Sequence, residues 1–178
     1  AEASQKYLCK IRDGGIFEIG LGFPDVDYAL GGGVESGEMV IIAARSGHGK
    51  SAVALQCIHY ATANGMPSLI ISQEMSALAL GKRTIQFASE MPRQYWHDSM
   101  DRVERDLQEH FAGKENCWVV ESVDCAEHAA EIIREKVKSN GVRCVAIDYA
   151  QMLKSEGKGR YEQVTNTSLI LKQLAKDT

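Results

Sequence analysis

The stretch that decides the fold is MVIIAARSGHGKSAVALQ, residues 39–56. It places a short apolar run before a glycine-rich turn and a helical pattern after it. The turn comes close to the phosphate-binding pattern G-x-x-x-x-G-K-[ST], in which backbone N–H groups and the N-terminal end of a helix bind phosphate oxygens. Ala44 stands where the pattern has its first glycine, and alanine fits there if its φ is negative. The sequence therefore predicts a phosphate-binding loop.

The residues of this loop have distinct expected roles. The predicted nucleotide-binding residues are Ala44, Arg45, Ser46, Gly47, His48, Gly49, Lys50 and Ser51. Gly47 and Gly49 let the backbone approach oxygen atoms that a Cβ would obstruct. Lys50 is expected to contact the β and γ phosphates, and the Ser51 hydroxyl is expected to ligate Mg²⁺. The alternative is a glycine-rich turn that binds no ligand.

Two carboxylates follow apolar runs at the positions where strands would end. Asp148 closes the run at 144–148, and we expect it to hold Mg²⁺ together with Ser51. Glu74 follows the run at 68–72, and it would polarise an attacking water if that strand lay beside the phosphate-loop strand. The alternatives are a loop-capping role for Asp148 and, for Glu74, a first-turn helix acid favoured by the helix dipole.

Four short apolar runs predict the strands. They are MVIIA at 39–43, SLIIS at 68–72, CWVVE at 117–121 and CVAID at 144–148. Because the runs are nearly continuous rather than alternating, they are typical of strands buried on both faces of a parallel sheet.

Four helical patterns lie between or after these runs. Their apolar stripes are Val53, Cys57, Ile58 and Ala61; Trp96, Met100, Val103, Leu107 and Phe111; Ala129, Ile132, Ile133 and Val137; and Val164, Ser168, Leu171 and Ala175. The first helix should stop at Asn64-Gly65, and the third should start at Ser122 or Asp124 and end at Gly141. The second stripe is expected to be core packing. Strands that alternate with helices predict an α/β fold, a mainly parallel sheet flanked by helices.

The composition and the cysteines indicate a globular protein without a membrane span or disulfide framework. The net charge of −4 argues against a broadly basic surface. No apolar run reaches the roughly 18 residues of a membrane span, and the first 15 residues lack a signal-peptide core, so we expect a cytoplasmic protein without membrane contact. The five cysteines include no C-x-x-C and are interpreted as reduced core residues. A zinc site at Cys117, Cys125 and His128 is disfavoured because it lacks a fourth ligand.

The motifs together resemble the RecA-like ATPases, and most closely the C-terminal motor domain of replicative helicases of the DnaB family. The segment GFPDVDYALGGGVESGEMVIIAARSGHGKSAVALQ looks like that family's phosphate-loop region, in which alanine characteristically stands at the position of Ala44. ISQEMS is similar to the family's S-L-E-M-S motif, with Gln73 in place of leucine. VAIDYAQML is similar to its Walker-B motif I-D-Y-L-Q-L. The resemblance implies that Glu74 is catalytic with Lys50, that Asp148 binds the metal and that Gln151 is a polar relay.

The resemblance also implies cofactors and partners. It points to a RecA-like P-loop NTPase that uses ATP and Mg²⁺, forms a homo-hexameric ring and moves on single-stranded DNA in the cytoplasm of a bacterial or phage-infected cell. A primase or a helicase loader is a further expected partner. The corresponding DNA-binding loop is LKSEGKGRYEQ, in which Lys154, Lys158 and Arg160 would meet phosphates. The alternative is a solvated loop with no ligand.

The expected domain organisation is a linker at 1–19 and a RecA-like ATPase domain at 20–178. The family's later sensor strand and its arginine finger have no counterpart here, so we expect a domain truncated on its C-terminal side and weak activity for the isolated fragment. Three alternatives stay open: another RecA-like ATPase of the RadA or KaiC type, a small-molecule kinase built on the same loop, and a non-catalytic interaction module.

Overall fold

A parallel three-stranded sheet forms the centre of the molecule. The computed structural model describes residues 5, 9, 12, 18–112 and 116–178. The strands are β3 (Ser68–Ser72), β4 (Cys117–Glu121) and β5 (Cys144–Asp148), in the order β4-β3-β5. Ser72 pairs with Glu121 on one side and with Asp148 on the other, so the three carboxyl ends are level. Three of the four predicted strands are thus confirmed residue for residue.

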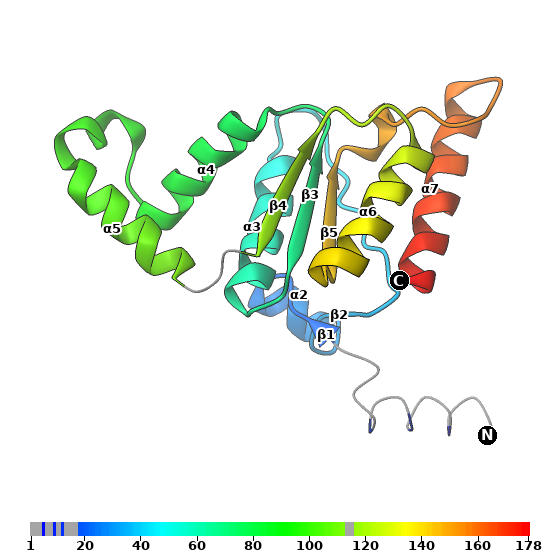
Figure 1. Cartoon of the computed structure of the whole chain (residues 1–178), viewed down its shortest axis with the longest axis horizontal. Coiled ribbons are helices and arrows are strands. Elements are labelled where there is room, and N and C mark those ends of the chain that lie inside the picture. The colour runs from blue at the N-terminus through cyan, green and yellow to red at the C-terminus, as the bar shows by residue number, and fades with distance from the viewer. Residues whose placement is uncertain (1–4, 6–8, 10–11, 13–17, 113–115) are drawn as a thin grey trace.

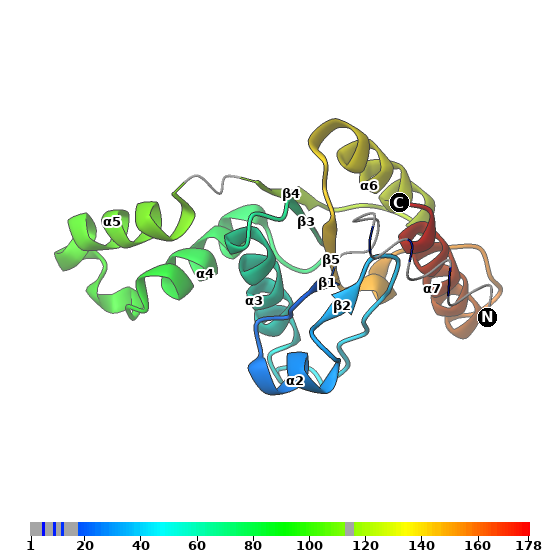
Figure 2. The same cartoon turned by 90° about the horizontal axis from the view of Figure 1, so that it is seen from below.

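Helices cover both faces of this sheet. The long helices are α3 (Lys50–Ala63), α4 (Ala77–Ser89), α5 (Met100–Phe111), α6 (Ala126–Asn140) and α7 (Arg160–Asp177). Short elements are β1 (Glu18–Ile19), α2 (Pro24–Ala29), β2 (Val34–Glu35) and 3₁₀ turns at Arg93–Tyr95, His97–Ser99 and Ala150–Met152. Figures 1 and 2 show α3 on one face of the sheet, α6 and α7 on the other, and α4 with α5 extending away from it. The predicted α/β architecture is confirmed.

The side chains of β3 alternate between two apolar clusters, one on each face. Leu69 and Ile71 pack with buried residues of α6 and α7. Ile70 packs on the opposite face with Leu55 and Ile58 of α3. Because β3 is the central strand and is buried along its whole length, it fixes both helical layers against the sheet.

The prediction of a strand at 39–43 is wrong. The segment forms no ladder with β5, and Ile41 is 72% exposed. An apolar run becomes a buried strand only when neighbours cover it, and the run itself does not say whether those neighbours are there. Within the described residues, β5 pairs only with β3, and its outer edge carries no strand.

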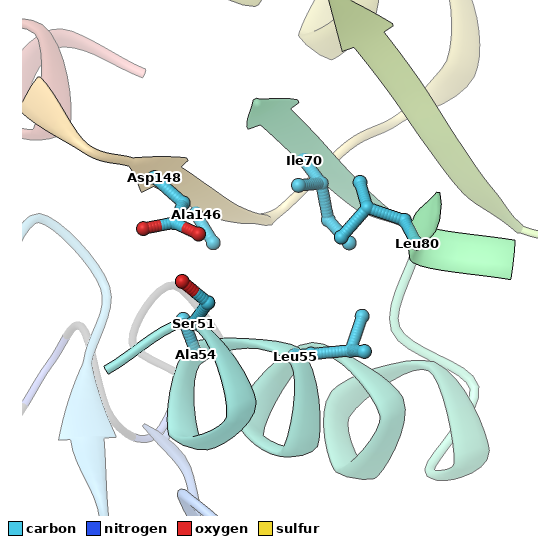
Figure 3. Close-up of a pocket in the computed structure, with 7 residues that line it drawn as sticks. All are labelled: Ser51, Ala54, Leu55, Ile70, Leu80, Ala146 and Asp148. Carbon is cyan, nitrogen blue, oxygen red and sulfur yellow. The ribbon is translucent and has the colours of Figure 1, made fainter. Parts of the chain in front are cut away.

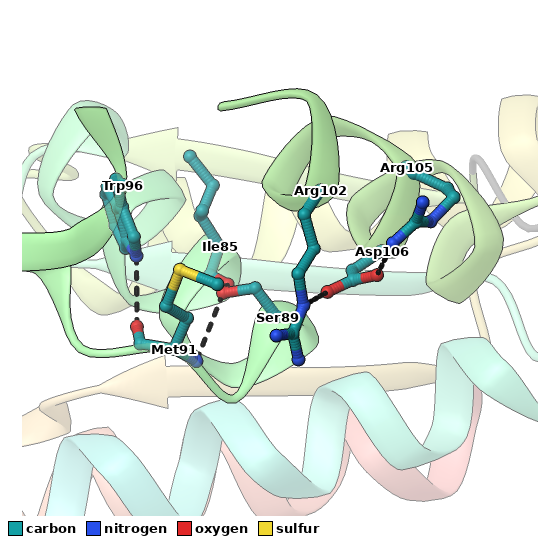
Figure 4. A network of polar contacts seen from close by, with 7 residues as sticks. All are labelled: Ile85, Ser89, Met91, Trp96, Arg102, Arg105 and Asp106. Atoms are coloured by element: carbon teal, nitrogen blue, oxygen red, sulfur yellow. Dashed lines mark hydrogen bonds and ion pairs between the residues drawn. The ribbon is translucent and has the colours of Figure 1, made fainter. Parts of the chain in front are cut away.

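The predicted helix that begins at Trp96 starts later. Ser99 leaves the helical region of the backbone with φ −136°, so α5 begins at Met100. Trp96 lies between the two 3₁₀ turns that precede α5, and its indole Nε1 donates to the Met91 carbonyl oxygen at 2.9 Å (Figure 4). Core packing of this stripe is only partly confirmed: Val103 is buried, whereas Met100 is 48% exposed. The side chain of Phe111 lies outside the described residues.

The start of α6 also differs from the prediction. Neither Ser122 nor Asp124 caps the helix; Cys125 does, and its Sγ accepts the His128 N–H at 3.4 Å. The reason is tertiary, because Asp124 and Ala126 make backbone hydrogen bonds to Lys154 and thereby fix where the helix can begin. The predicted end at Gly141 is confirmed, with φ +67°.

Two further features bear on the domain organisation. None of the described helices is long and apolar enough to cross a membrane. Most of the predicted linker at 1–19 lies outside the described residues, whereas Glu18 and Ile19 form β1 and pair antiparallel with β2.

Candidate functional site

The predicted phosphate-binding loop lies at the N-terminal end of α3, at the sheet edge where the strands end (Figure 1). Gly49 immediately precedes α3 with φ +82°, and Gly47 has φ +78°. A Cβ added at either glycine would meet no atom within 4 Å. The glycines are therefore required by the left-handed backbone conformation and not by crowding within the loop.

Lys50 folds back over this loop. Its Nζ donates to the Ala44 carbonyl oxygen at 3.0 Å and to the Arg45 carbonyl oxygen at 3.3 Å. The His48 side chain is exposed, and its Nδ1 lies 3.0 Å from the Ser46 carbonyl oxygen. Ala44 contributes a main-chain carbonyl, which any residue supplies, and it is not among the described residues with positive φ, so alanine is compatible with this position. The ammonium and the free N–H groups at the start of α3 together form a positive region that suits an anion.

Ser51 and Asp148 lie across a small pocket between α3 and the sheet (Figure 3). The pocket is lined by Ser51, Ala54, Leu55, Ile70, Leu80, Ala146 and Asp148. In the close-up, the Ser51 hydroxyl and the Asp148 carboxylate point toward one another. Asp148 is only 7% exposed, and its Oδ2 atom has no hydrogen-bonding partner within the described residues. A buried carboxylate oxygen without a partner is costly, and a cation or a donor supplied by a ligand would remove that cost.

These two side chains fit a Mg²⁺ ion. A hydroxyl and a carboxylate are hard oxygen donors, and Mg²⁺ is commonly held by one or two such groups together with substrate phosphates and water. In the described part of the chain, no three His, Cys, Asp or Glu side chains gather as a protein-only metal cage would require. The donor set therefore suits a metal that arrives with a nucleotide.

Glu74 lies on the same edge but not where the sequence argument placed it. The prediction required the strand before Glu74 to lie beside a strand that leads into the phosphate-binding loop. That strand, β3, instead pairs with β5 and β4, so this requirement is not met. Glu74 is exposed in the turn between β3 and α4. The alternative of a first-turn helix acid is also wrong, because α4 begins at Ala77 with Ser76 as its cap. What brings Glu74 near Asp148 is the Gln73 N–H, which donates to the Asp148 carbonyl oxygen at 2.7 Å.

Gln151 and the basic loop follow β5 on the same side of the molecule. Gln151 is exposed in the 3₁₀ turn Ala150–Met152. Lys154, Lys158 and Arg160 are all exposed, and Figure 1 shows their loop projecting next to the N-terminal end of α7. The loop is tied to the start of α7, since the Lys158 N–H donates to Glu162 Oε2 at 2.7 Å. It is therefore a solvent-facing loop with an anchored base.

Two polar residues of this edge have no role in the sequence analysis: Gln73 is noted only as a harmless replacement of leucine, and Glu121 is not considered. The Gln73 side chain donates through Nε2 to the Val123 carbonyl oxygen at 2.7 Å. Glu121, at the end of β4, accepts the N–H of Ala77 at the first position of α4. For Glu121 a signal was present, because it ends an apolar run just as Asp148 does. For Gln73 the signal was a polar residue at a position where the S-L-E-M-S motif has leucine.

Within the part of the chain that the structure describes, the cysteines do not gather into a metal-binding cluster. Cys117 opens β4, whereas Cys125 follows the other end of that strand, so they cannot share a zinc ion with His128. All five thiols are free. Cys9 is exposed and the other four are half-buried, so the expectation of a core position is wrong for Cys9. Burial, aided by the neighbouring Cys57 and Cys117, raises the pKa of Cys144 to about 11, so this thiol stays protonated.

Comparison with known proteins identifies the family. A model described as DnaB-like helicase C terminal domain matches residues 19–178. The chain belongs to this DnaB-like helicase family. A replicative DNA helicase DnaB of Leifsonia xyli subsp. xyli (strain CTCB07) is 28% identical over 176 residues, which cover 94% of this chain and 38% of that protein. A replicative DNA helicase DnaB of Rhodothermus marinus is 30% identical over 184 residues, covering 93% of this chain and 19% of that protein. The chain thus spans well under half the length of these relatives.

Solved structures support the fold of the DnaB-like domain. A solved structure described as an ATPase domain superposes on this chain with a TM-score of 0.81 at 24% sequence identity. The match covers 99% of this chain and 66% of the solved chain. A DnaB-like replicative helicase, described with its interactions with primase, gives a TM-score of 0.80 and 24% identity over 99% of this chain and 45% of that one. The RecA-like fold is thereby confirmed. The family match favours the helicase assignment over the RadA-like, KaiC-like and kinase alternatives.

Proposed function

We propose that this chain is the ATP-hydrolysing motor domain of a hexameric replicative DNA helicase, which couples hydrolysis to movement on single-stranded DNA and duplex unwinding. The observation that carries the proposal is the pair of Ser51 and Asp148 across the pocket beside Lys50. Membership of the DnaB-like family supports the same assignment.

In this proposal the loop and the pocket bind Mg²⁺-ATP. The N–H groups of residues 44–51 and the Lys50 ammonium bind the phosphates, and Lys50 exchanges its carbonyl partners for phosphate oxygens. Ser51 and Asp148 would hold the metal through their side-chain oxygens. Bound Mg²⁺ supplies charge neutralisation to the β and γ phosphate oxygens.

The remaining catalytic roles fall on the strand ends. Glu74 is exposed and follows Gln73, whose N–H is bonded to the Asp148 backbone, so we assign its carboxylate the role of orienting a water molecule and accepting its proton. Gln151 lies three positions after Asp148 at the start of the segment that leads to the basic loop. Its amide can both donate and accept, which suits a relay between the nucleotide and that loop.

The proposed partners follow from the basic loop and from the family. Lys154, Lys158 and Arg160 would contact phosphates of single-stranded DNA in the channel of a homo-hexameric ring. A primase or a helicase loader would bind the assembled ring. The expected setting is the cytoplasm of a bacterial or phage-infected cell.

Nucleotide binding tests the proposal. A fluorescent ATP analogue with Mg²⁺ is titrated into the wild type, Lys50→Ala and the control Lys138→Ala, which changes an exposed lysine of α6. The wild type and the control should bind alike, and Lys50→Ala should lose at least about tenfold in affinity, because a charge-assisted hydrogen bond to phosphate is removed. Equal binding by Lys50→Ala, or no binding by the folded wild type, would contradict the proposal.

A further inference from the structure

Gln73 connects the ends of all three strands. It follows β3 directly and precedes Glu74. Its backbone N–H donates to the Asp148 carbonyl oxygen at the end of β5, at 2.7 Å. Its side-chain Nε2 donates to the Val123 carbonyl oxygen beyond the end of β4, also at 2.7 Å. Because a carbonyl oxygen only accepts hydrogen bonds, the NH₂ end of the amide must face Val123, which fixes the orientation of the side chain.

The Val123 end of this connection is firmly held. Val123 and Leu153 are each 3% exposed and belong to the same apolar cluster. Next to them, the Lys154 N–H donates to the Asp124 carbonyl oxygen at 3.2 Å, and the Ala126 N–H donates to the Lys154 carbonyl oxygen at 2.9 Å. The segment after β4 is thus hydrogen-bonded on one side to Gln73 and on the other to Lys154 of the basic loop.

We propose that Gln73 is a positioning residue that transmits movement of the Glu74 turn to the base of the basic loop at Lys154. This inference rests on the proposed function. A displacement of the Glu74 turn on nucleotide binding must move the Gln73 amide, which pulls on Val123. Since Val123 is one residue from Asp124, the displacement reaches the hydrogen bonds that hold Lys154. A leucine at position 73 keeps the backbone bond to Asp148 but has no donor for Val123, so this connection depends on the glutamine side chain.

Amide hydrogen exchange tests this role in the full chain. Exchange is measured with and without adenylyl imidodiphosphate and Mg²⁺ in the wild type and in Gln73→Met, which has similar length but no donor. In the wild type, nucleotide should slow exchange both at 44–51 and at 153–160. In Gln73→Met, the slowing at 44–51 should persist and the slowing at 153–160 should be lost. Gln73→Lys, which restores a donor of similar reach, should recover the response at 153–160.

The controls separate this role from a merely structural one. Gln94→Met removes an exposed glutamine from a 3₁₀ turn and should behave as the wild type. If Gln73 only stabilised the fold, Gln73→Met would lower the melting temperature, but nucleotide would still slow exchange at both 44–51 and 153–160. That result would overturn the inference. So would a wild type that responds at 44–51 but not at 153–160. A wild type with no response at 44–51 would overturn the proposed function itself.

Discussion

The buried carboxylate of Asp148 points at the Ser51 hydroxyl, and no hydrogen bond within the described residues reaches its Oδ2 atom. The two residues come from different elements, since Ser51 lies in the first turn of α3 and Asp148 ends β5. Their approach creates a place for a cation at a cost to the ligand-free protein, because a buried carboxylate oxygen is left without a hydrogen-bonding partner among the described residues. That cost makes the role of Asp148 testable through stability as well as through binding.

Asp148→Asn should separate stability from function. Without nucleotide or metal, the substitution replaces a buried carboxyl group that lacks a partner at Oδ2 by a neutral amide, and it should raise the free energy of unfolding by about 0.5–2 kcal/mol. It should also abolish the effect of Mg²⁺ on nucleotide affinity. Urea unfolding and nucleotide titration with and without Mg²⁺ measure the two effects. Asp124→Asn, at an exposed position, is the control. A less stable Asp148→Asn would show that the carboxylate is already compensated in the free protein.

Replacing either loop glycine, Gly47 or Gly49, by a residue with a Cβ should destabilise the protein. The reason is the backbone conformation and not a steric clash. Gly47→Ala and Gly49→Ala should each lower the free energy of unfolding by about 1–2 kcal/mol, because both residues have positive φ. Gly81→Ala is the matched control, since Gly81 lies inside α4 with open space around it and without positive φ. It should instead stabilise the protein by about 0.5–1 kcal/mol. Denaturant unfolding of the three variants measures this contrast, and a stabilised Gly49→Ala would refute the conformational explanation.

His59 should make the protein sensitive to acid. Burial, and secondarily the nearby His110, lowers the pKa of His59 from 6.5 to about 4. The ring lies against Phe87, and its Nε2 is 3.1 Å from Thr84 Oγ1, so the neutral form is packed between α3 and α4. Because the unfolded chain binds the proton more readily, this contribution is fully present above pH 6.5 and is lost as the pH falls toward 4. The shift corresponds to about 3 kcal/mol over that window.

Unfolding free energies at pH 7 and pH 5 measure this effect. His59→Gln should lose part of the pH dependence in that range. His128→Gln changes an exposed histidine of α6 and should retain the wild-type dependence. If His59→Gln kept the full dependence, the carboxylates and not His59 would control the acid sensitivity.

The basic loop should bind single strands through charge. Lys158→Ala and Arg160→Ala should each reduce the slope of log affinity against log salt concentration by about 0.7, the value for one phosphate contact on a single strand. Fluorescence anisotropy with a single-stranded oligonucleotide at several salt concentrations, in the presence of nucleotide, measures the slopes. Lys138→Ala should leave the slope unchanged. Unchanged slopes in both loop variants would place the DNA elsewhere.

The fold could be predicted where local pattern and tertiary context agree. The runs at 68–72, 117–121 and 144–148 became strands because each has a paired neighbour and helices to cover it. The run at 39–43 has the same apolar character but no ladder, since pairing depends on neighbours that the run does not encode. The cap of α6 shows the same limit, because backbone bonds to Lys154 selected Cys125 over residues with better capping propensity.

The approach of Ser51 and Asp148 could be predicted for a general reason. In parallel α/β folds, the carboxyl ends of the strands and the N-terminal ends of the following helices meet at one edge. The contact between the Gln73 amide and Val123 could not, because nothing in the local sequence of either residue indicates the other. It required the register of β3 and β4, which only the assembled sheet defines.

The hydrogen bond between Gln73 and Val123 joins residues 50 positions apart, and β5 lies further along the chain. Contacts between residues so far apart in the sequence form late in folding, because the chain between them must lose conformational entropy before the contact stabilises the fold. During synthesis, the phosphate-binding loop and α3 leave the ribosome well before β5 is made. The nascent chain therefore carries Lys50 and Ser51 without Asp148, and the pocket proposed here to bind nucleotide is completed only when β5 joins the sheet.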